Sequence, residues 1–206
     1  MTASLARTSG SPAGPGLPPP ALSPRHSPRL LPAAAANRSG PAIRLQALPE
    51  GLLQVHTAPF RGSFGSVFSQ ALRTAGLGSR VLVSQFLKGG VDQGVESSLW
   101  LCGRLQWLRP AVAACLEQPA TEAGEAAAAV AEVWHFSREQ LLSGAVDLMV
   151  LDELGLAIEL GYVALDEVVA TLERRPAHLD VMLTGPAMPA ELMAMADQVT
   201  QLRRGL

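Results

Sequence analysis

Cysteine is scarce in this 206-residue sequence, and its two cysteines, Cys102 and Cys115, cannot build a disulfide framework or an all-cysteine zinc site. Long hydrophobic runs are missing as well. No stretch of about 18 apolar residues is free of charges, Gly and Pro, which argues against a membrane-spanning segment. A basic excess is also absent, since the formal net charge is −2, and this argues against a nucleic-acid-binding protein. We therefore expect a cytoplasmic protein with neither membrane nor nucleic acid as a partner.

Acidic residues are absent from residues 1–49, which hold five arginines and ten of the 16 prolines. This segment lacks the apolar periodicity that would offset the entropy cost of ordering it, so we expect a disordered or polyproline-II-like tail. An acid-free segment with Arg and Ser is also typical of an organelle transit peptide, and this alternative stays open. All 18 acids lie from Glu50 onward. We predict one domain over residues 50–206, long enough to bury a core.

Apolar runs of strand length alternate with helical segments from residue 50 onward. Residues 80–86 and 146–151 are apolar at successive positions, which is typical of strands covered on both faces. Further strands are predicted near residues 51–56, 103–108, 179–184 and 198–203. Helices are predicted near residues 67–76, 121–143, 155–161, 165–174 and 189–196. This alternation predicts an α/β fold, with a mostly parallel sheet and helices on both faces.

In such a sheet ligands bind beyond the carboxyl ends of the strands, and this rule selects the loops after Val55, Phe86, Leu151 and Thr184. Two of these segments stand out. The first is the loop Thr57–Ser66, which lacks the G-x-x-x-x-G-K-[ST] phosphate-binding pattern and by itself also fits an ordinary turn. The second is Asp152-Glu153, which directly follows a predicted buried strand. Carboxylates at this position either hold Mg²⁺ or favour the start of the next helix, and the sequence leaves both interpretations open.

Several short blocks, in this order along the chain, carry a family resemblance. They are Gly51–Thr57 (GLLQVHT), Ala71–Gly78 (ALRTAGLG), Val83–Gly89 (VSQFLKG), Trp134, Leu151–Leu154 (LDEL), Gly161–Val168 (GYVALDEV), Arg175-Pro176, Thr184-Gly185 and Ala196–Thr200 (ADQVT). Together, over about residues 51–204, they resemble the ATP:corrinoid adenosyltransferases of cobalamin biosynthesis. The resemblance is to the P-loop type, which acts on cobalamin and on cobyrinic acid a,c-diamide.

The resemblance implies a P-loop NTPase-like sheet and a transferase that moves the 5′-deoxyadenosyl group of ATP to Co(I) of a corrinoid. ATP and Mg²⁺ are the implied cofactors, the corrinoid is the implied substrate, and a homodimer is implied as well. Asp152 and Glu153 are then expected to be catalytic and to bind Mg²⁺. The residues expected to bind the triphosphate of ATP are Thr57, Arg61, Gly62, Ser63, Phe64 and Gly65.

The chain departs from the family at its functional motifs. The family loop T-G-N-G-K-G-K-T-T aligns with Thr57–Gly65, so Ser63 replaces the phosphate-binding lysine and Phe64 replaces the Mg²⁺-binding hydroxyl. Three hypotheses follow. One is an adenosyltransferase in which Arg61 supplies the charge of the loop. The other is a catalytically silent homologue that binds a nucleotide, a corrinoid or a partner protein as a regulator. A P-loop relative with an unrelated nucleotide substrate is a third.

Overall fold

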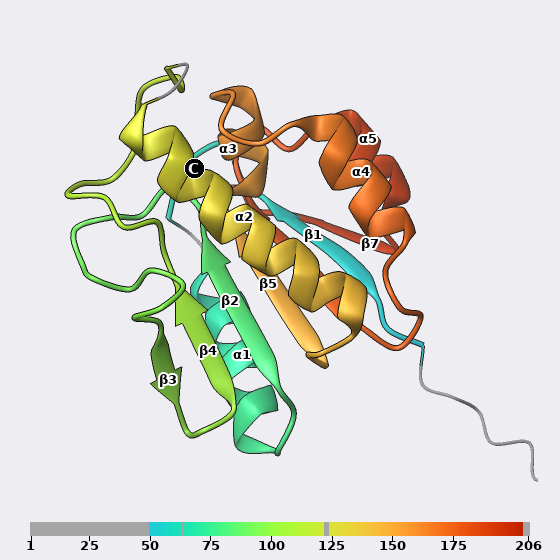
Figure 1. Cartoon of the computed structure of the whole chain (residues 1–206). Helices are drawn as coiled ribbons and strands as arrows, with labels where there is room; N and C mark the ends of the chain where they lie inside the picture. The colour runs from blue at the N-terminus through green and yellow to red at the C-terminus, as the bar shows by residue number, and fades with distance from the viewer. Residues whose placement is uncertain (1–49, 63, 122–123, 204–206) are drawn as a thin grey trace, which may run out of the picture. The chain divides into compact units, whose positions relative to one another are not determined.

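One sheet forms the centre of the residues that the computed structural model describes, which are 50–62, 64–121 and 124–203. Its strands are β1 (Leu53–Thr57), β2 (Val81–Gln85), β3 (Leu99–Leu101), β4 (Leu105–Leu108), β5 (Leu148–Asp152), β6 (Asp180–Gly185) and β7 (Gln198–Gln201). Their order in space is β3-β4-β2-β5-β6-β1-β7, and every neighbouring pair is parallel except β3 and β4 (Figure 1). The prediction of a mostly parallel sheet is confirmed.

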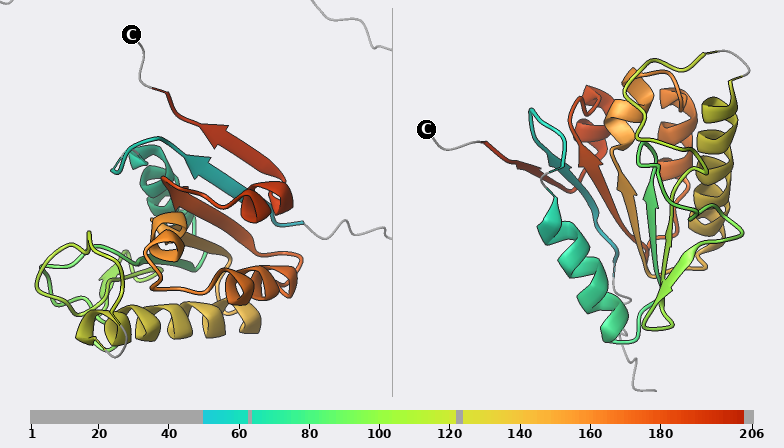
Figure 2. Two further views of the ribbon diagram at one scale, coloured as in Figure 1. Left: turned by 90° about the horizontal axis from the view of Figure 1, so that it is seen from above. Right: turned by 90° about the vertical axis from the view of Figure 1, so that its left-hand side faces the viewer.

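Helices cover both faces of this sheet, as the sequence predicted. They are α1 (Gly65–Gly76), α2 (Glu125–Ser143), α3 (Leu154–Glu159), α4 (Leu165–Glu173) and α5 (Ala190–Met195). Helix α1 packs against β2, β4 and β5 on one face, while the other helices lie on the opposite face (Figure 2).

The two helical layers each enclose an apolar core. On the α1 side, Val67, Ala71 and Ala75 recur at intervals of four residues and pack with Val150 and Met182 of the sheet. The larger core lies on the other side, between the sheet and helices α2 to α5. Strands β2 and β5 are buried at every position because both of their faces are covered, which explains their continuous apolar runs.

The structure corrects two predicted boundaries and adds one strand. The strand predicted from residue 103 begins at Leu105, because Cys102 and Gly103 form a turn with positive φ (44° and 65°). That turn leads from β3, an exposed three-residue strand too short to show a pattern in the sequence. The helix predicted from Thr121 begins at Glu125, with Gly124 as its extended N-cap residue.

The predicted tail, residues 1–49, lies outside the described residues. Within the described part of the chain, no helix is both long enough and apolar enough to cross a lipid bilayer. That residues 50–206 form the functional domain stays a prediction.

The carboxyl ends of β1, β6 and β5 lie at one edge of the sheet. Thr57 at the end of β1 pairs with Gly185 of β6, and β6 separates β1 from β5. Glu153, directly after β5, has a left-handed backbone with φ of 59°. A Cβ at Gly185 would lie 2.9 Å from the Cα of Glu153, so only glycine lets these two turns approach. This edge positions the predicted site residues.

Candidate functional site

Arg61, in the loop after β1, is bound to the carboxylate of Glu153. Its Nε donates to Oε1 at 2.8 Å and its Nη2 donates to Oε2 at 2.7 Å. The third nitrogen, Nη1, donates to the carbonyl oxygen of Leu116 at 3.2 Å. The hydrogen bond with Glu153 is the main cause that raises the pKa of Arg61 above its ordinary value. This bidentate pair fastens the loop to the end of β5.

Asp152, the last residue of β5, is buried and hydrogen-bonded on both carboxylate oxygens. Oδ2 accepts from Nε2 of Gln85 at 2.6 Å, and Oδ1 accepts from the hydroxyl of Thr184 at 2.5 Å. Burial raises the pKa of Asp152, and the hydrogen bonds from Thr184 and Gln85 act in the opposite direction. Strands β2 and β6 therefore hold this carboxyl group in one orientation.

Gln85 connects Asp152 to strand β4 and the loop after it. Its carbonyl oxygen accepts from Nε1 of Trp107 at 2.9 Å and from Nε of Arg109 at 2.7 Å. The guanidinium of Arg109 also lies 6.0 Å from the centre of the Trp107 ring. With two donors facing the oxygen, the amide nitrogen of Gln85 must face Asp152.

Lys88 follows β2 and is the only lysine in the sequence. Its Nζ lies 3.5 Å from Oε1 of Glu153, and its side chain is 29% exposed. The side chain borders a cavity of about 240 Å³, together with Asp152, Glu153 and the loop residues Gly62 and Gly65. The structure thus places a cation and two carboxylates around one small space.

The predicted loop residues divide among three cavities, and Arg61 borders one that is separate from the cavity at Lys88. Gly62, Phe64 and Gly65 border the cavity at Lys88, so the structure brings them together with Asp152 and Glu153. Phe64 is only 2% exposed, because its ring belongs to the core under α1. Thr57 lies in a different cavity. The predicted role of Ser63 concerns a residue outside the described ones.

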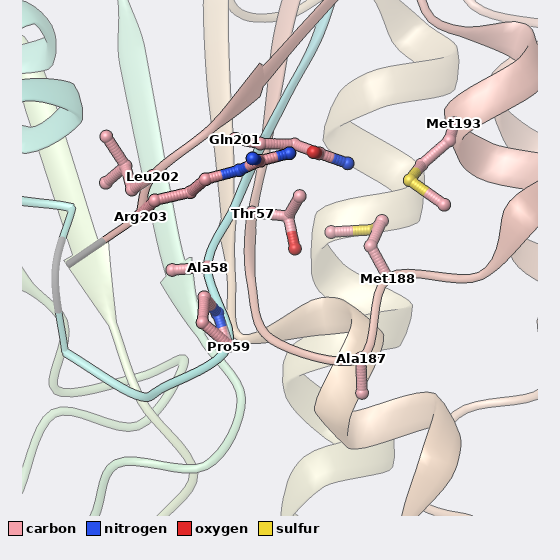
Figure 3. A pocket seen from close by; sticks show the side chains of 9 residues that line it. All are labelled: Thr57, Ala58, Pro59, Ala187, Met188, Met193, Gln201, Leu202 and Arg203. Carbon is pink, nitrogen blue, oxygen red and sulfur yellow. The ribbon is translucent and has the colours of Figure 1, made fainter. Parts of the chain in front are cut away.

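The cavity at Thr57 measures about 540 Å³ and opens beside the ends of β1 and β7 (Figure 3). Thr57 and Pro59 border it on the loop side, and Met188 and Met193 come from the segment after β6 and from α5. Arg203 borders it beyond β7. Its volume lies within the range of roughly 300–1,000 Å³ that is usual for small-molecule sites.

The side chains at the edge do not fit a magnesium site. Both oxygens of Glu153 accept from Arg61, and both oxygens of Asp152 accept from neutral donors. Phe64 of the loop is buried and offers no oxygen ligand, and no group of three or more metal-ligating side chains occurs among the described residues. Proteins hold Mg²⁺ through one or two carboxylates together with water and substrate phosphates, and here the carboxylate oxygens already accept hydrogen bonds while the cations of Arg61 and Lys88 would repel it.

Three contributors to the site were missed from the sequence: Lys88, Gln85 and Thr184. Each lies at the carboxyl end of a buried strand, or directly beyond it, which is the signal that selected Asp152 and Glu153. Lys88 carried a second signal, since it is the sole lysine of the chain.

The described sheet, with a loop between β1 and α1 and carboxylates after β5, defines an α/β protein of the P-loop-like class. Comparison with known proteins gives the family: the family described as ATP:corrinoid adenosyltransferase BtuR/CobO/CobP matches residues 49–205. Corrinoid adenosyltransferase CobA of Salmonella typhimurium is 32% identical over 153 residues, which cover 74% of this chain and 76% of the relative.

Two further relatives agree with this match. The corrinoid adenosyltransferase of Escherichia coli is 31% identical, over 74% of this chain and 76% of the relative. That of Pseudomonas aeruginosa is 31% identical, over 74% of each chain. The chain therefore belongs to the ATP:corrinoid adenosyltransferase family, as the sequence blocks indicated.

Proposed function

We propose that this protein transfers the 5′-deoxyadenosyl group of ATP to Co(I) of a corrinoid, in cobalamin biosynthesis or salvage. In this reaction the cobalt electron pair forms a bond to C5′ of ATP. The C5′–oxygen bond breaks, and triphosphate leaves with the bonding electrons. The observation that carries the proposal is the convergence of the loop, Lys88 and Asp152 around one cavity in a chain of this family.

The residues at this edge suit a reaction that releases a polyphosphate. Negative charge grows on the leaving oxygens, so cations fixed beside them lower the barrier more than they stabilise bound ATP. Lys88 supplies positive charge beside the loop. The contact with Glu153 holds the Arg61 guanidinium, and with it the loop, in place. The larger cavity at Thr57, bordered by Met188 and Met193, offers apolar surface for the nucleoside. No step of the proposed reaction is assigned to a metal ion held by Asp152 or Glu153.

The test is a corrinoid adenosylation assay on the full chain, under anaerobic conditions with a chemical reductant that maintains Co(I). Cobalamin and cobyrinic acid a,c-diamide are compared as substrates, and the Salmonella typhimurium relative serves as the positive control. We expect an ATP-dependent, light-sensitive adenosylated product with at least one substrate. No product above the protein-free rate, while the control turns over, would contradict the proposed activity.

A catalytically silent homologue is the second candidate, and one observation favours it. Phe64 is packed in the core at the position where the family has a metal-binding hydroxyl, so this position offers no oxygen to a metal ion. Such a protein would act as a regulator that binds a nucleotide, a corrinoid or a partner enzyme. ATP binding without product in the adenosylation assay would support it.

The remaining expectations belong to the same proposal. The activity resides in residues 50–206, with residues 1–49 as a tail, and the protein acts in the cytoplasm as a homodimer without nucleic acid. Sedimentation of the full chain tests the dimer, and the adenosylation assay on residues 50–206 tests whether the tail is dispensable. A monomeric, active chain would remove the dimer from the proposal.

A further inference from the structure

The two cations at the loop differ in how many of their donors are already used. Each of the three nitrogens of Arg61 donates a hydrogen bond, two to Glu153 and one to Leu116. Lys88, in contrast, forms one ion pair among the described residues, with Nζ 3.5 Å from Oε1 of Glu153. That separation is longer than a good charge-assisted hydrogen bond. Lys88 therefore keeps donors for a ligand, while Arg61 uses three of its five N–H groups within the protein and is not among the residues that border this cavity.

The backbone on the far side of the cavity also suits an anion. Gly62 and Gly65 face open space, since a Cβ at either position would have no neighbour within 4 Å. Helix α1 begins at Gly65, its N-cap residue Phe64 makes no side-chain cap, and its first turn has no acidic residue. The positive end of a 12-residue helix thus points toward the cavity that Lys88 borders.

The two carboxylates beside the cavity, those of Asp152 and Glu153, repel an anion less than two free carboxylates would, because both already accept hydrogen bonds from the protein. Glu153 is neutralised by its bidentate contact with Arg61. Both oxygens of Asp152 are occupied by Gln85 and Thr184. Lys88 is the cation among the residues that border the cavity.

We infer that Lys88 is the cation that binds the phosphate groups of a polyphosphate ligand in this cavity, in place of the lysine missing from the loop. The Arg61–Glu153 pair is a brace that holds the loop around the ligand. This inference rests on the proposed function for the identity of the ligand, the triphosphate part of ATP. It also assigns the role that sequence reasoning gave to Arg61 to a residue in the segment after β2.

The test uses inorganic triphosphate and isothermal titration calorimetry on the full chain. Lys88→Met is expected to weaken triphosphate binding by roughly 10- to 100-fold, the effect of losing one charge-assisted contact. Lys88→Arg keeps the charge and is expected to retain part of the affinity. The matched control is Arg104→Met, which removes a cation from the turn before β4 and should leave the affinity unchanged. Circular dichroism confirms that each variant is folded, and Lys88→Gln replaces any Lys88→Met protein that is not.

The outcomes separate this inference from the proposed function. Wild-type affinity in the folded Lys88→Met or Lys88→Gln variant, or no triphosphate binding by the wild type at millimolar concentration, overturns the role of Lys88. Loss of binding confined to the Lys88 variants supports it, even if the wild type fails the adenosylation assay. Adenosylation that Lys88→Met leaves intact overturns the role of Lys88 while the proposed function stands.

Discussion

Both carboxylate oxygens of Glu153 accept hydrogen bonds from the guanidinium of Arg61, across 92 positions of sequence. The Glu153 side chain is 2% exposed and that of Arg61 is 28% exposed, so the pair is largely shielded from water. A loop without the family lysine is thereby joined to the strand end that bears the two acids. The same contact removes Arg61 from the set of free cations and leaves Lys88 facing the cavity.

Breaking this pair should destabilise the fold, because a buried carboxylate loses its partner. We expect Arg61→Met to lower the free energy of unfolding by about 3 kcal/mol. This is the lower end of the usual cost of removing one partner of a buried ion pair, because Arg61 is partly exposed. Glu153→Gln should cost less in the Arg61→Met background than in the wild type. Urea unfolding of the two single variants and the double variant measures this coupling. Strictly additive losses would show that the contact does not hold the loop.

Phe64 should contribute to stability as a core residue. Replacing it with threonine, the residue type of the family loop, removes a ring that is 2% exposed and is expected to cost about 3 kcal/mol. The control is Leu77→Thr, where the side chain is 83% exposed and the change should be small. Thermal and urea unfolding compare the two variants. Equal effects would mean that Phe64 is not packed in the core under α1.

Gly185 should not tolerate a side chain. Its φ is 129°, and a Cβ would lie 2.9 Å from the Cα of Glu153, so Gly185→Ala forces the two turns apart. We expect a loss of about 1–3 kcal/mol, the usual cost of a strained backbone. Gly76→Ala is the control, because a Cβ there meets open space. A Gly185→Ala protein as stable as this control would contradict the close approach of β6 and the β5–α3 turn.

Asp152 should give the stability a defined pH dependence. Burial raises the pKa of Asp152 in the folded state above the value of about 3.8 that it has in the unfolded chain. Above about pH 4, the folded protein therefore keeps a proton on Asp152 that the unfolded chain has released. The contribution of Asp152 to stability therefore falls as pH rises from about 4 through the folded-state pKa. Asp152→Asn lacks this dependence, so its stability relative to wild type should improve as pH rises through that window. The variant also changes the hydrogen bonds at this position, which shifts the stability difference between variant and wild type by the same amount at every pH. A flat difference between pH 4 and 8 would contradict the burial of the charge.

The parallel α/β sheet was predictable because both faces of β2 and β5 are covered, and continuous apolar runs result. The location of Asp152 and Glu153 was predictable for a related reason, since residues after parallel strands gather at one edge. Strand β3 was not predictable, because its three residues are too few to show a pattern of alternating apolar and polar positions.

The contacts within the site were beyond the reach of the sequence. The Arg61–Glu153 pair depends on the left-handed backbone of Glu153, which approaches residue 185 so closely that only glycine fits there. The residues around Glu153 and Gly185 in the sequence indicate neither feature. The orientation of Gln85 likewise depends on Trp107 and Arg109, which lie 22 and 24 positions away. Side-chain direction and long-range pairing decided which cation faces the cavity.

The most direct measurement is a calorimetric titration of ATP into the full chain, with Mg²⁺ and again with an excess of chelator. The account predicts binding that persists in the chelator, because the charge facing the phosphates comes from Lys88 and from the start of α1. Absence of binding at millimolar ATP under both conditions, or binding that requires Mg²⁺ strictly, would contradict the assignment of this cavity.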